Sequence, residues 1–302
     1  MNDPYSKHEA FVAPARDMSD LGRVIIVIIG AEIAFLLGPL VFATLLPGSW
    51  LENAFYEGDK PLGLVLQLFS FVVAGLALLR LVNLQHQRGF ASLIGPSAIV
   101  IHDLRRCTKM VLIVLVAQII LPPWPAGSEG VTMQPLVPWI LWIPVAFVAV
   151  IIQAGTEELF FRGYLQQQFA ALSNNKIIWM AAPAAMFGAG HYFNGYGVAD
   201  GTIYAIWAFL LGLACADLTA RTGSIGAALG LHVANNMVAL FYVSIQDWPS
   251  SGLALFRYPY EDPYAHDLSL AALLTPSGLL EIFVAGLMVL ILWLAARIAI
   301  RA

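Results

Sequence analysis

Two adjacent glutamates and an arginine are the residues whose types and spacing first suggest chemistry. Glu157, Glu158 and Arg162 follow a long apolar run and are set among leucine and phenylalanine side chains. Charged groups in such surroundings are costly unless paired, and at membrane depth they mark a functional site by default. On a helix, Glu158 and Arg162 are four positions apart with the acid first, the better order for an ion pair. Glu157 points about 100° away, so the pattern predicts one paired carboxylate and one free to react. The alternative is a helix end whose charges are merely solvated.

Two histidines and an asparagine lie at membrane depth further along the chain. His191 ends the segment Phe-Gly-Ala-Gly-His, while His232 and Asn236 are four residues apart and so share one helical face. A lone histidine in a membrane helix is most often a packing residue that bonds a carbonyl group. Two histidines, an asparagine and a free carboxylate instead favour a site, provided that they converge.

These side-chain types suit the hydrolysis of an amide. The carboxylate of Glu157 can take a proton from water. The side chains of His191, His232 and Asn236 can polarise the carbonyl group and hold the negative charge that develops on its oxygen. Zinc is an alternative, because it accepts histidine and carboxylate ligands, here Glu157, His191 and His232. Three other protease signatures are absent from the sequence: His-Glu-x-x-His, Gly-x-Ser-Gly and a pair of membrane aspartates.

The composition indicates an integral, multi-pass membrane protein. Hydrophobic residues make up 60% of the 302 residues and charged residues only 11%, and the mean hydropathy is +0.78. Soluble proteins carry about a quarter of charged residues. The lipid bilayer is therefore an expected partner and nucleic acid is not. Cys107 and Cys215 fall in or beside apolar spans and suggest no disulfide framework.

The apolar segments predict an all-α fold with about eight transmembrane helices. Continuous runs of this length can cross a hydrocarbon core about 30 Å thick, and only helices fit them. Residues 1–22 are expected to be a polar, loosely ordered tail, and residues 23–302 a single transmembrane domain with its motif-bearing core at 135–245. The predicted spans lie near residues 24–46, 61–82, 107–122, 136–155, 177–194, 202–220, 224–245 and 278–298.

The basic residues predict the orientation. Of the 15 lysine and arginine residues, only Lys60 and Arg257 fall on one side of these spans, which places both termini in the cytoplasm. The long loop 247–276 lies on the opposite side. Its aromatic residues favour an interfacial belt, with a lid over the helices as the alternative; they are Trp248, Phe256, Tyr258, Tyr260 and Tyr264.

Counting from a turn at residues 173–175 tests whether the site residues converge. Glu157 lies 17 residues before Asn174 and His191 lies 17 residues after it. If both arms are helical, the two side chains are at the same height, about 25 Å from the turn. This requires the fourth helix to continue to about residue 172. We expect the carboxylate and the imidazole to lie less than about 8 Å apart, with His232 and Asn236 closing the same cavity and Phe160, Phe161 or Phe187 in its wall.

Other charged residues give weaker signals. Asp217 and Arg221 are four residues apart near a cytoplasmic helix end, which favours a structural ion pair. Glu32 and Glu281 have no evident partner in the sequence. A place outside the site is favoured for both, with a site role as the alternative. No role is assigned to the histidines of the tail and loops, which are His8, His86, His102 and His266.

Three motifs in order resemble the CAAX prenyl protease and bacteriocin-processing family, known as CPBP or Abi. They are Glu157-Glu158-x-x-x-Arg162, Phe187-x-x-x-His191 and His232-x-x-x-Asn236, and the resemblance covers about residues 135–245. It implies that Glu157 is the general base, that His191, His232 and Asn236 complete the site, and that Glu158 and Arg162 support it. Members of this family are described both as metalloproteases and as metal-free glutamate peptidases. We favour no cofactor, because a compact ligand pair such as His-x-x-x-His is missing, and zinc stays open.

The resemblance implies an intramembrane endopeptidase, a hydrolase acting on a peptide or lipidated protein in the bacterial inner (plasma) membrane. The main alternative is a non-catalytic membrane scaffold or bacteriocin-immunity protein that uses the same polar pocket for binding. A transporter is disfavoured, because the sequence shows neither repeated halves nor paired broken helices. The oligomeric state and the substrate are not predicted.

Overall fold

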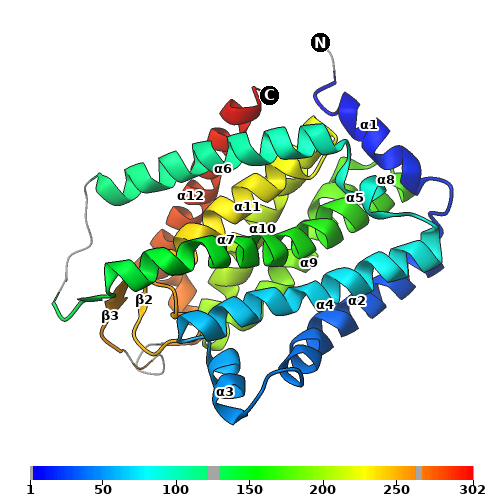
Figure 1. The fold of residues 1–302 in the computed structure, drawn as a ribbon. Helices are drawn as coiled ribbons and strands as arrows, with labels where there is room; N and C mark the ends of the chain where they lie inside the picture. Colours follow the sequence, from blue (N-terminus) through cyan, green and yellow to red (C-terminus); the bar gives the residue numbers. More distant parts are fainter. Residues whose placement is uncertain (1–2, 122–128, 261, 263–266, 302) are drawn as a thin grey trace.

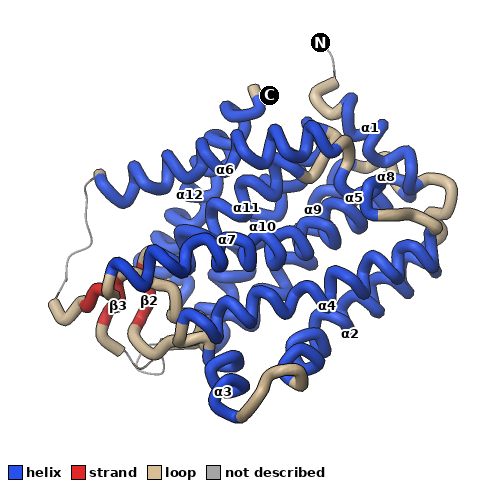
Figure 2. The backbone as a smooth tube through the Cα atoms, viewed as in Figure 1, coloured by secondary structure: helices blue, strands red, loops and turns tan. Residues whose placement is uncertain are grey.

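The computed structural model describes residues 3–121, 129–260, 262 and 267–301, and these form a bundle of helices with a small sheet at one end (Figures 1 and 2). The all-α prediction is confirmed for the body of the chain. The helices are α1 (Ser6–Val12), η1 (Ala13–Ala15), α2 (Leu21–Ala43), α3 (Ser49–Glu57), α4 (Pro61–His86), α5 (Phe90–Ile94), α6 (Ser97–Ile120), α7 (Leu136–Glu158), η2 (Leu159–Gln166), α8 (Gln167–Leu172), α9 (Lys176–His191), η3 (Tyr192–Asn194), α10 (Gly197–Thr222), α11 (Gly226–Phe241), η5 (Leu270–Leu274) and α12 (Pro276–Ile300).

Five helices in the described residues are long and apolar enough to cross a membrane: α2, α4, the continuous helix Leu136–Leu172, α10 and α12. Helix α11 is apolar but shorter. Every predicted span coincides with a helix, but α6 carries four charged residues between Asp103 and Lys109 and α9 has only 16 residues. Five of the eight predicted crossings are thus long and apolar enough to span a membrane, and the number eight stays a prediction. Large apolar side chains on the bundle surface, such as Leu36 and Leu141, are each 73% exposed, as expected for a multi-pass membrane protein that faces lipid.

The first part of the chain is more ordered than its composition suggested. Residues 6–15 form α1 and η1, so the expectation of a loosely ordered segment is wrong for them. Val12 is buried in a small apolar cluster with Trp179 and Ala220, and Phe11 is buried as well. Burying these side chains outweighs the polarity of their neighbours and docks α1 on the bundle. The division into a tail and one transmembrane domain stays a prediction.

Both ends of the chain meet at the same end of the bundle. The Tyr5 hydroxyl and the Trp293 indole donate hydrogen bonds to the two oxygens of Asp217, at 2.7 and 2.8 Å. Arg221 also bonds this carboxylate, at 2.8 Å, so Asp217 ties α1, α10 and α12 together. Figure 1 shows the two termini on one side of the molecule. This agrees with termini on one face of the membrane; their cytoplasmic location stays a prediction.

The site-bearing hairpin has the predicted length. Helix α7 continues without a break through η2 and α8 to Leu172, and α9 begins after Asn175, whose side chain accepts a hydrogen bond from the backbone of Ile177 at 3.0 Å. The segment η2 is a π-helix, a wide turn that occurs frequently at functional sites. Gly163 of η2 lies so close to α5 that a Cβ atom there would be 2.7 Å from the carbonyl oxygen of Leu93. A glycine at this position therefore lets α5 pack against the wide turn.

A small sheet lies away from both termini (Figure 1). In the described residues it has the order β1-β3-β2, with β1 (Thr132–Met133) antiparallel and β2 (Val243–Ile245) parallel to β3 (Phe256–Tyr258). It includes part of the long loop. The Trp248 ring lies 4.8 Å from that of Tyr196 and 6.5 Å from that of Tyr260, whereas Tyr264 lies outside the described residues. The choice between belt and lid stays open.

Candidate active site

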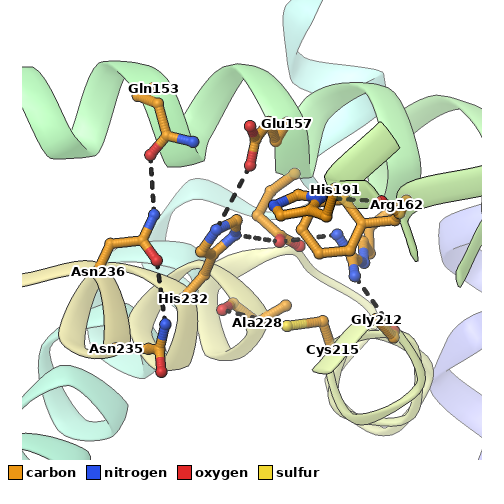
Figure 3. A network of polar contacts seen from close by, with 12 residues as sticks. Gln153, Glu157, Arg162, His191, Gly212, Cys215, Ala228, His232, Asn235 and Asn236 are labelled. Atoms are coloured by element: carbon orange, nitrogen blue, oxygen red, sulfur yellow. Dashed lines mark hydrogen bonds and ion pairs between the residues drawn. The ribbon is translucent and has the colours of Figure 1, made fainter. Parts of the chain in front are cut away.

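The polar residues singled out in the sequence come from helices that pack against one another in the middle of the bundle. Glu157 and Glu158 end α7, Arg162 lies in η2, and His232 lies in α11, which packs on α7. Figure 3 shows the Glu157 and His232 side chains pointing toward each other between the helices. Glu158, Arg162 and His232 are almost completely buried, and Glu157 is 8% exposed. Since buried charges require partners, their contacts decide what each can do.

Glu158 is the paired carboxylate. Its Oε1 atom accepts hydrogen bonds from Arg162 at 2.9 Å and from Nδ1 of His232 at 2.8 Å. Arg162 also donates to the carbonyl oxygen of Gly212 at 3.2 Å, and its guanidinium carbon lies 5.0 Å from the centre of the Phe187 ring. The ion pair expected from the four-residue spacing is confirmed. Because its charge is compensated from two sides, Glu158 is suited to holding the site rather than to reacting.

Glu157 faces the other nitrogen of the same imidazole. Nε2 of His232 lies 3.4 Å from Oε2 of Glu157. This approach does not have the geometry of a hydrogen bond, and Oε2 is buried without a hydrogen-bond partner among the described residues. A carboxylate can only accept, so Nδ1 of His232 carries the hydrogen that points to Glu158. Glu157 is therefore left with an acceptor atom that a water molecule can use.

Asn236 extends the contact between α11 and α7 by one turn. Its Nδ2 atom donates to Oε1 of Gln153 at 2.9 Å, and its Oδ1 atom accepts from Nδ2 of Asn235 at 3.1 Å. The shared face of His232 and Asn236 is thus confirmed, since both reach polar side chains of α7. Gln153 and Asn235 were not assigned in the sequence. Gln153 could have been found from its position, because it lies four residues before Glu157 and so on the same side of α7.

His191 joins this group through Phe187. It is half-buried at the end of α9, and its Nδ1 atom donates to the carbonyl oxygen of Phe187 at 2.9 Å. The Phe187 ring centre lies 4.3 Å from that of His191 and 5.8 Å from that of His232. The distance between the two imidazole centres therefore cannot exceed the sum of these two values. Phe161 packs on Phe187 at 5.0 Å, so aromatic rings border the site; the separation of Glu157 and His191 stays a prediction.

A second group of buried polar side chains connects η2 to α4 and α10. It was not predicted from the sequence, and His86, which was expected in a loop, ends α4. His86 is buried; its Nδ1 atom donates to the carbonyl oxygen of Met18 at 2.7 Å, and its Nε2 atom lies 2.8 Å from the hydroxyl of Tyr164. Gln166 is buried and donates to the carbonyl oxygen of Ala216 at 3.1 Å. These contacts hold η2 against α4 and α10. The signal in the sequence was the run of three glutamines at 166–168 inside an apolar region.

Glu157, His191 and His232 are the residues that would hold a zinc ion at this site. No group of three or more His, Cys, Asp or Glu side chains that could hold a metal ion occurs in the part of the chain that the structure describes. Glu157 and His232 approach each other as two such donors, whereas catalytic zinc sites use three protein ligands. As placed, the residues do not form a zinc site, and the reaction proposed below uses only side chains of this chain.

Comparison with known protein families identifies the region that carries the candidate site. Residues 138–238 match the family described as Rce1-like, type II CAAX prenyl endopeptidase. This region runs from α7 to α11 and contains all six candidate site residues. The chain therefore carries a domain of the Rce1-like (CPBP/Abi) family, as the motifs indicated.

Part of the chain is also similar to a curated protein of Bacillus subtilis. The chain is 36% identical over 127 residues to the uncharacterized protein YyaK of Bacillus subtilis (strain 168). The match covers 41% of this chain and 42% of that protein, so the chain spans less than half of its relative's length. No solved structure matches the chain.

Proposed function

We propose that this protein is an intramembrane endopeptidase that hydrolyses a peptide bond in a membrane-associated protein or peptide. The observation that carries the proposal is the placement of His232 between two carboxylates, with a hydrogen bond to Glu158 and an unbonded approach to Glu157. This gives one anchored acid and one acid with a free acceptor atom in a buried setting. The Rce1-like domain over residues 138–238 supports the same class of reaction.

In the proposed reaction Glu157 is the general base. Its Oε2 atom takes a proton from water while the water oxygen bonds to the scissile carbonyl carbon. The tetrahedral intermediate then loses the amine, and the proton held by Glu157 passes to the leaving nitrogen as the carbon–nitrogen bond breaks. Water is consumed and a carboxylic acid and an amine are formed, so no oxidant or further reactant is needed.

Asn236 is the proposed donor to the oxyanion. One of its two amide hydrogens is used on Gln153, which leaves the second for the developing negative charge. His191 has a different role from the one expected from the sequence. Its Nδ1–H is bonded to the carbonyl oxygen of Phe187, which leaves Nε2 as the ring nitrogen that can contact and orient the attacking water. Removing a single oxyanion donor costs about 100- to 1,000-fold in kcat in well-studied hydrolases.

The proposed substrate is a peptide or lipidated protein held at the bilayer. The helices that carry the site belong to a bundle with lipid-facing apolar surfaces, so a soluble peptide would have to leave water to reach Glu157. A lipid tail or an apolar segment would hold the substrate at this depth. The proposed location is the bacterial inner membrane.

Cleavage of a fluorogenic, membrane-anchored reporter peptide in detergent or nanodiscs tests the proposal. Wild type is expected to cleave, and Glu157→Ala and Glu157→Gln are expected to be inactive, while the control Glu52→Gln, on the exposed face of α3, keeps wild-type turnover. Wild-type turnover by Glu157→Gln would overturn the role of Glu157. A wild-type protein that binds the reporter without cutting it would support a non-catalytic binding protein instead. Zinc content measured on the same sample decides whether a metal accompanies the reaction.

A further inference from the structure

Gln153, Asn236 and Asn235 form a chain of side-chain amides beside the candidate base. Asn235 donates to Asn236 at 3.1 Å, and Asn236 donates to Gln153 at 2.9 Å. Gln153 and Asn235 are buried, at 7% and 9% exposure, and Asn236 is half-buried. Asn235 donates, Asn236 accepts with its oxygen and donates with its nitrogen, and Gln153 accepts, so the hydrogen bonds run in one direction, from α11 to α7.

The orientation of the Asn236 amide depends on its two hydrogen-bond partners, Gln153 and Asn235. If the Asn236 amide turned over, its oxygen would face the oxygen of Gln153 and its nitrogen would face the nitrogen of Asn235. Two hydrogen bonds would become two contacts between like atoms, in a buried setting where unsatisfied polar groups are costly. The acceptor atom on Gln153 and the donor atom on Asn235 therefore select a single orientation of the Asn236 amide.

That orientation matters for the reaction because the two ends of an asparagine amide are chemically opposite. With nitrogen toward α7, the second N–H of Asn236 has no partner among the described residues and is available to an oxyanion. With oxygen toward α7, the site would present a lone pair to the same negative charge. Gln153 also lies one helical turn before Glu157, and Figure 3 shows the two side chains on the same side of α7. The acceptor for Asn236 and the candidate base therefore lie on the same side of one helix.

We propose that Gln153 is a positioning residue for peptide hydrolysis, which fixes the Asn236 amide so that its free N–H faces the reacting carbonyl group. This inference rests on the proposed function and adds a residue to it that the three motifs do not contain. Gln153 acts through Asn236 and does not itself react. The acceptor oxygen is the part of its side chain that the role requires.

Two substitutions distinguish the effect of the acceptor oxygen of Gln153 from the effect of the size of its side chain. Gln153→Met has nearly the same size and no strong acceptor, whereas Gln153→Glu keeps an acceptor oxygen at the same position. For Gln153→Met we expect kcat to fall by about 10- to 100-fold with KM changed by less than about two-fold, since the loss is confined to the transition state. For Gln153→Glu we expect most of the wild-type kcat, because the acceptor oxygen is kept. This kcat is compared at the optimal pH of the variant, since the added carboxylate lies one turn from Glu157 and can change the pH dependence. Wild-type kcat in Gln153→Met would overturn the proposal, as would an equal loss in both variants.

A spectroscopic measurement tests the orientation without relying on turnover. In protein labelled with [15N]asparagine, the side-chain resonances of Asn236 are identified by their loss in Asn236→Asp. We expect Gln153→Met to shift them and Gln153→Glu to preserve a hydrogen-bonded position. Unchanged resonances in Gln153→Met would overturn the positioning role even if its activity fell.

The two readouts also separate this inference from the proposed function. If wild type shows no cleavage that depends on Glu157, the proposed function fails, and the Asn236 resonances still decide whether Gln153 sets the amide. If wild type cleaves and Glu157→Gln does not, but Gln153→Met has wild-type kcat, only the positioning role fails. Asn235→Ala removes the other hydrogen bond that selects the orientation, so it is expected to lower kcat in the same direction as Gln153→Met; an unchanged kcat would contradict the proposal.

Discussion

Nδ1 of His232 lies 2.8 Å from Oε1 of Glu158, although the two residues are 74 positions apart in the chain. The contact joins α11 to the end of α7 and makes one carboxylate oxygen the acceptor for both His232 and Arg162. It also sets the tautomer of the imidazole, because a carboxylate offers only acceptor atoms. The adjacent Glu157 has no such anchor, and this difference is the basis of the first prediction.

Glu158→Gln is expected to destabilise the protein, whereas Glu157→Gln is not. Removing the Glu158 charge leaves Arg162 buried without its counter-charge, and breaking a buried pair in this way costs about 3–5 kcal/mol. Thermal unfolding and detergent-solubilised yield of the two glutamine variants measure the contrast, with wild type as reference. Equal stability of the two variants would show that Glu158 is not the anchor of the site.

Arg162→Ala is expected to fold poorly as well as to lose activity, because Glu158 would then be buried with His232 as its remaining ion-pair partner among the described residues. Arg162→Lys is the informative companion. A lysine can pair with Glu158 but lacks the planar fork that also reaches Gly212 and lies by Phe187. We expect stability between those of wild type and Arg162→Ala. A stable, well-expressed Arg162→Ala protein would argue against the pair.

The docking of α1 is expected to weaken in acid because of His8. Burial lowers the pKa of His8 from 6.5 to about 4, and this effect outweighs the opposing attraction of Glu9. The His8 ring lies 4.3 Å from that of Trp179, and its Nε2 atom lies 3.3 Å from the amide nitrogen of Gln166. This nitrogen of His8 must be unprotonated to accept from the amide.

The folded and unfolded pKa values of His8 determine the direction in which stability changes with pH. Between pH 6.5 and about 4 the undocked His8 binds a proton that the docked one does not, so stability falls as the pH falls through this window and is unaffected by His8 above it. The loss is at most about 3 kcal/mol. Thermal unfolding and Trp179 fluorescence from pH 7.5 to 4.5, for wild type and His8→Gln, measure it. A pH dependence that is identical in the two proteins would rule out His8 as the cause.

Several features of the site could be predicted from the sequence because they depend on spacing along one helix. The Glu158–Arg162 pair and the common face of His232 and Asn236 follow from 3.6 residues per turn. The continuation of the fourth helix to about residue 172 followed from the position of the turn at residues 173–175. Apolar length likewise predicted helices at every proposed span. Charge in α6 and the short lengths of α9 and α11 leave five of them long and apolar enough to cross a membrane.

The remaining features depended on how the helices rotate and cross, which periodicity does not determine. Periodicity shows which residues share a face, but not which side chain that face meets. The tertiary structure therefore decided that His232 bonds Glu158 rather than Glu157, and that Asn236 meets Gln153. It also placed the π-helical turn after Glu158 and docked α1 through apolar side chains in a polar segment. The physical reason is the same in each case: the partner is supplied by a distant part of the chain, and only packing brings it within hydrogen-bonding or van der Waals distance.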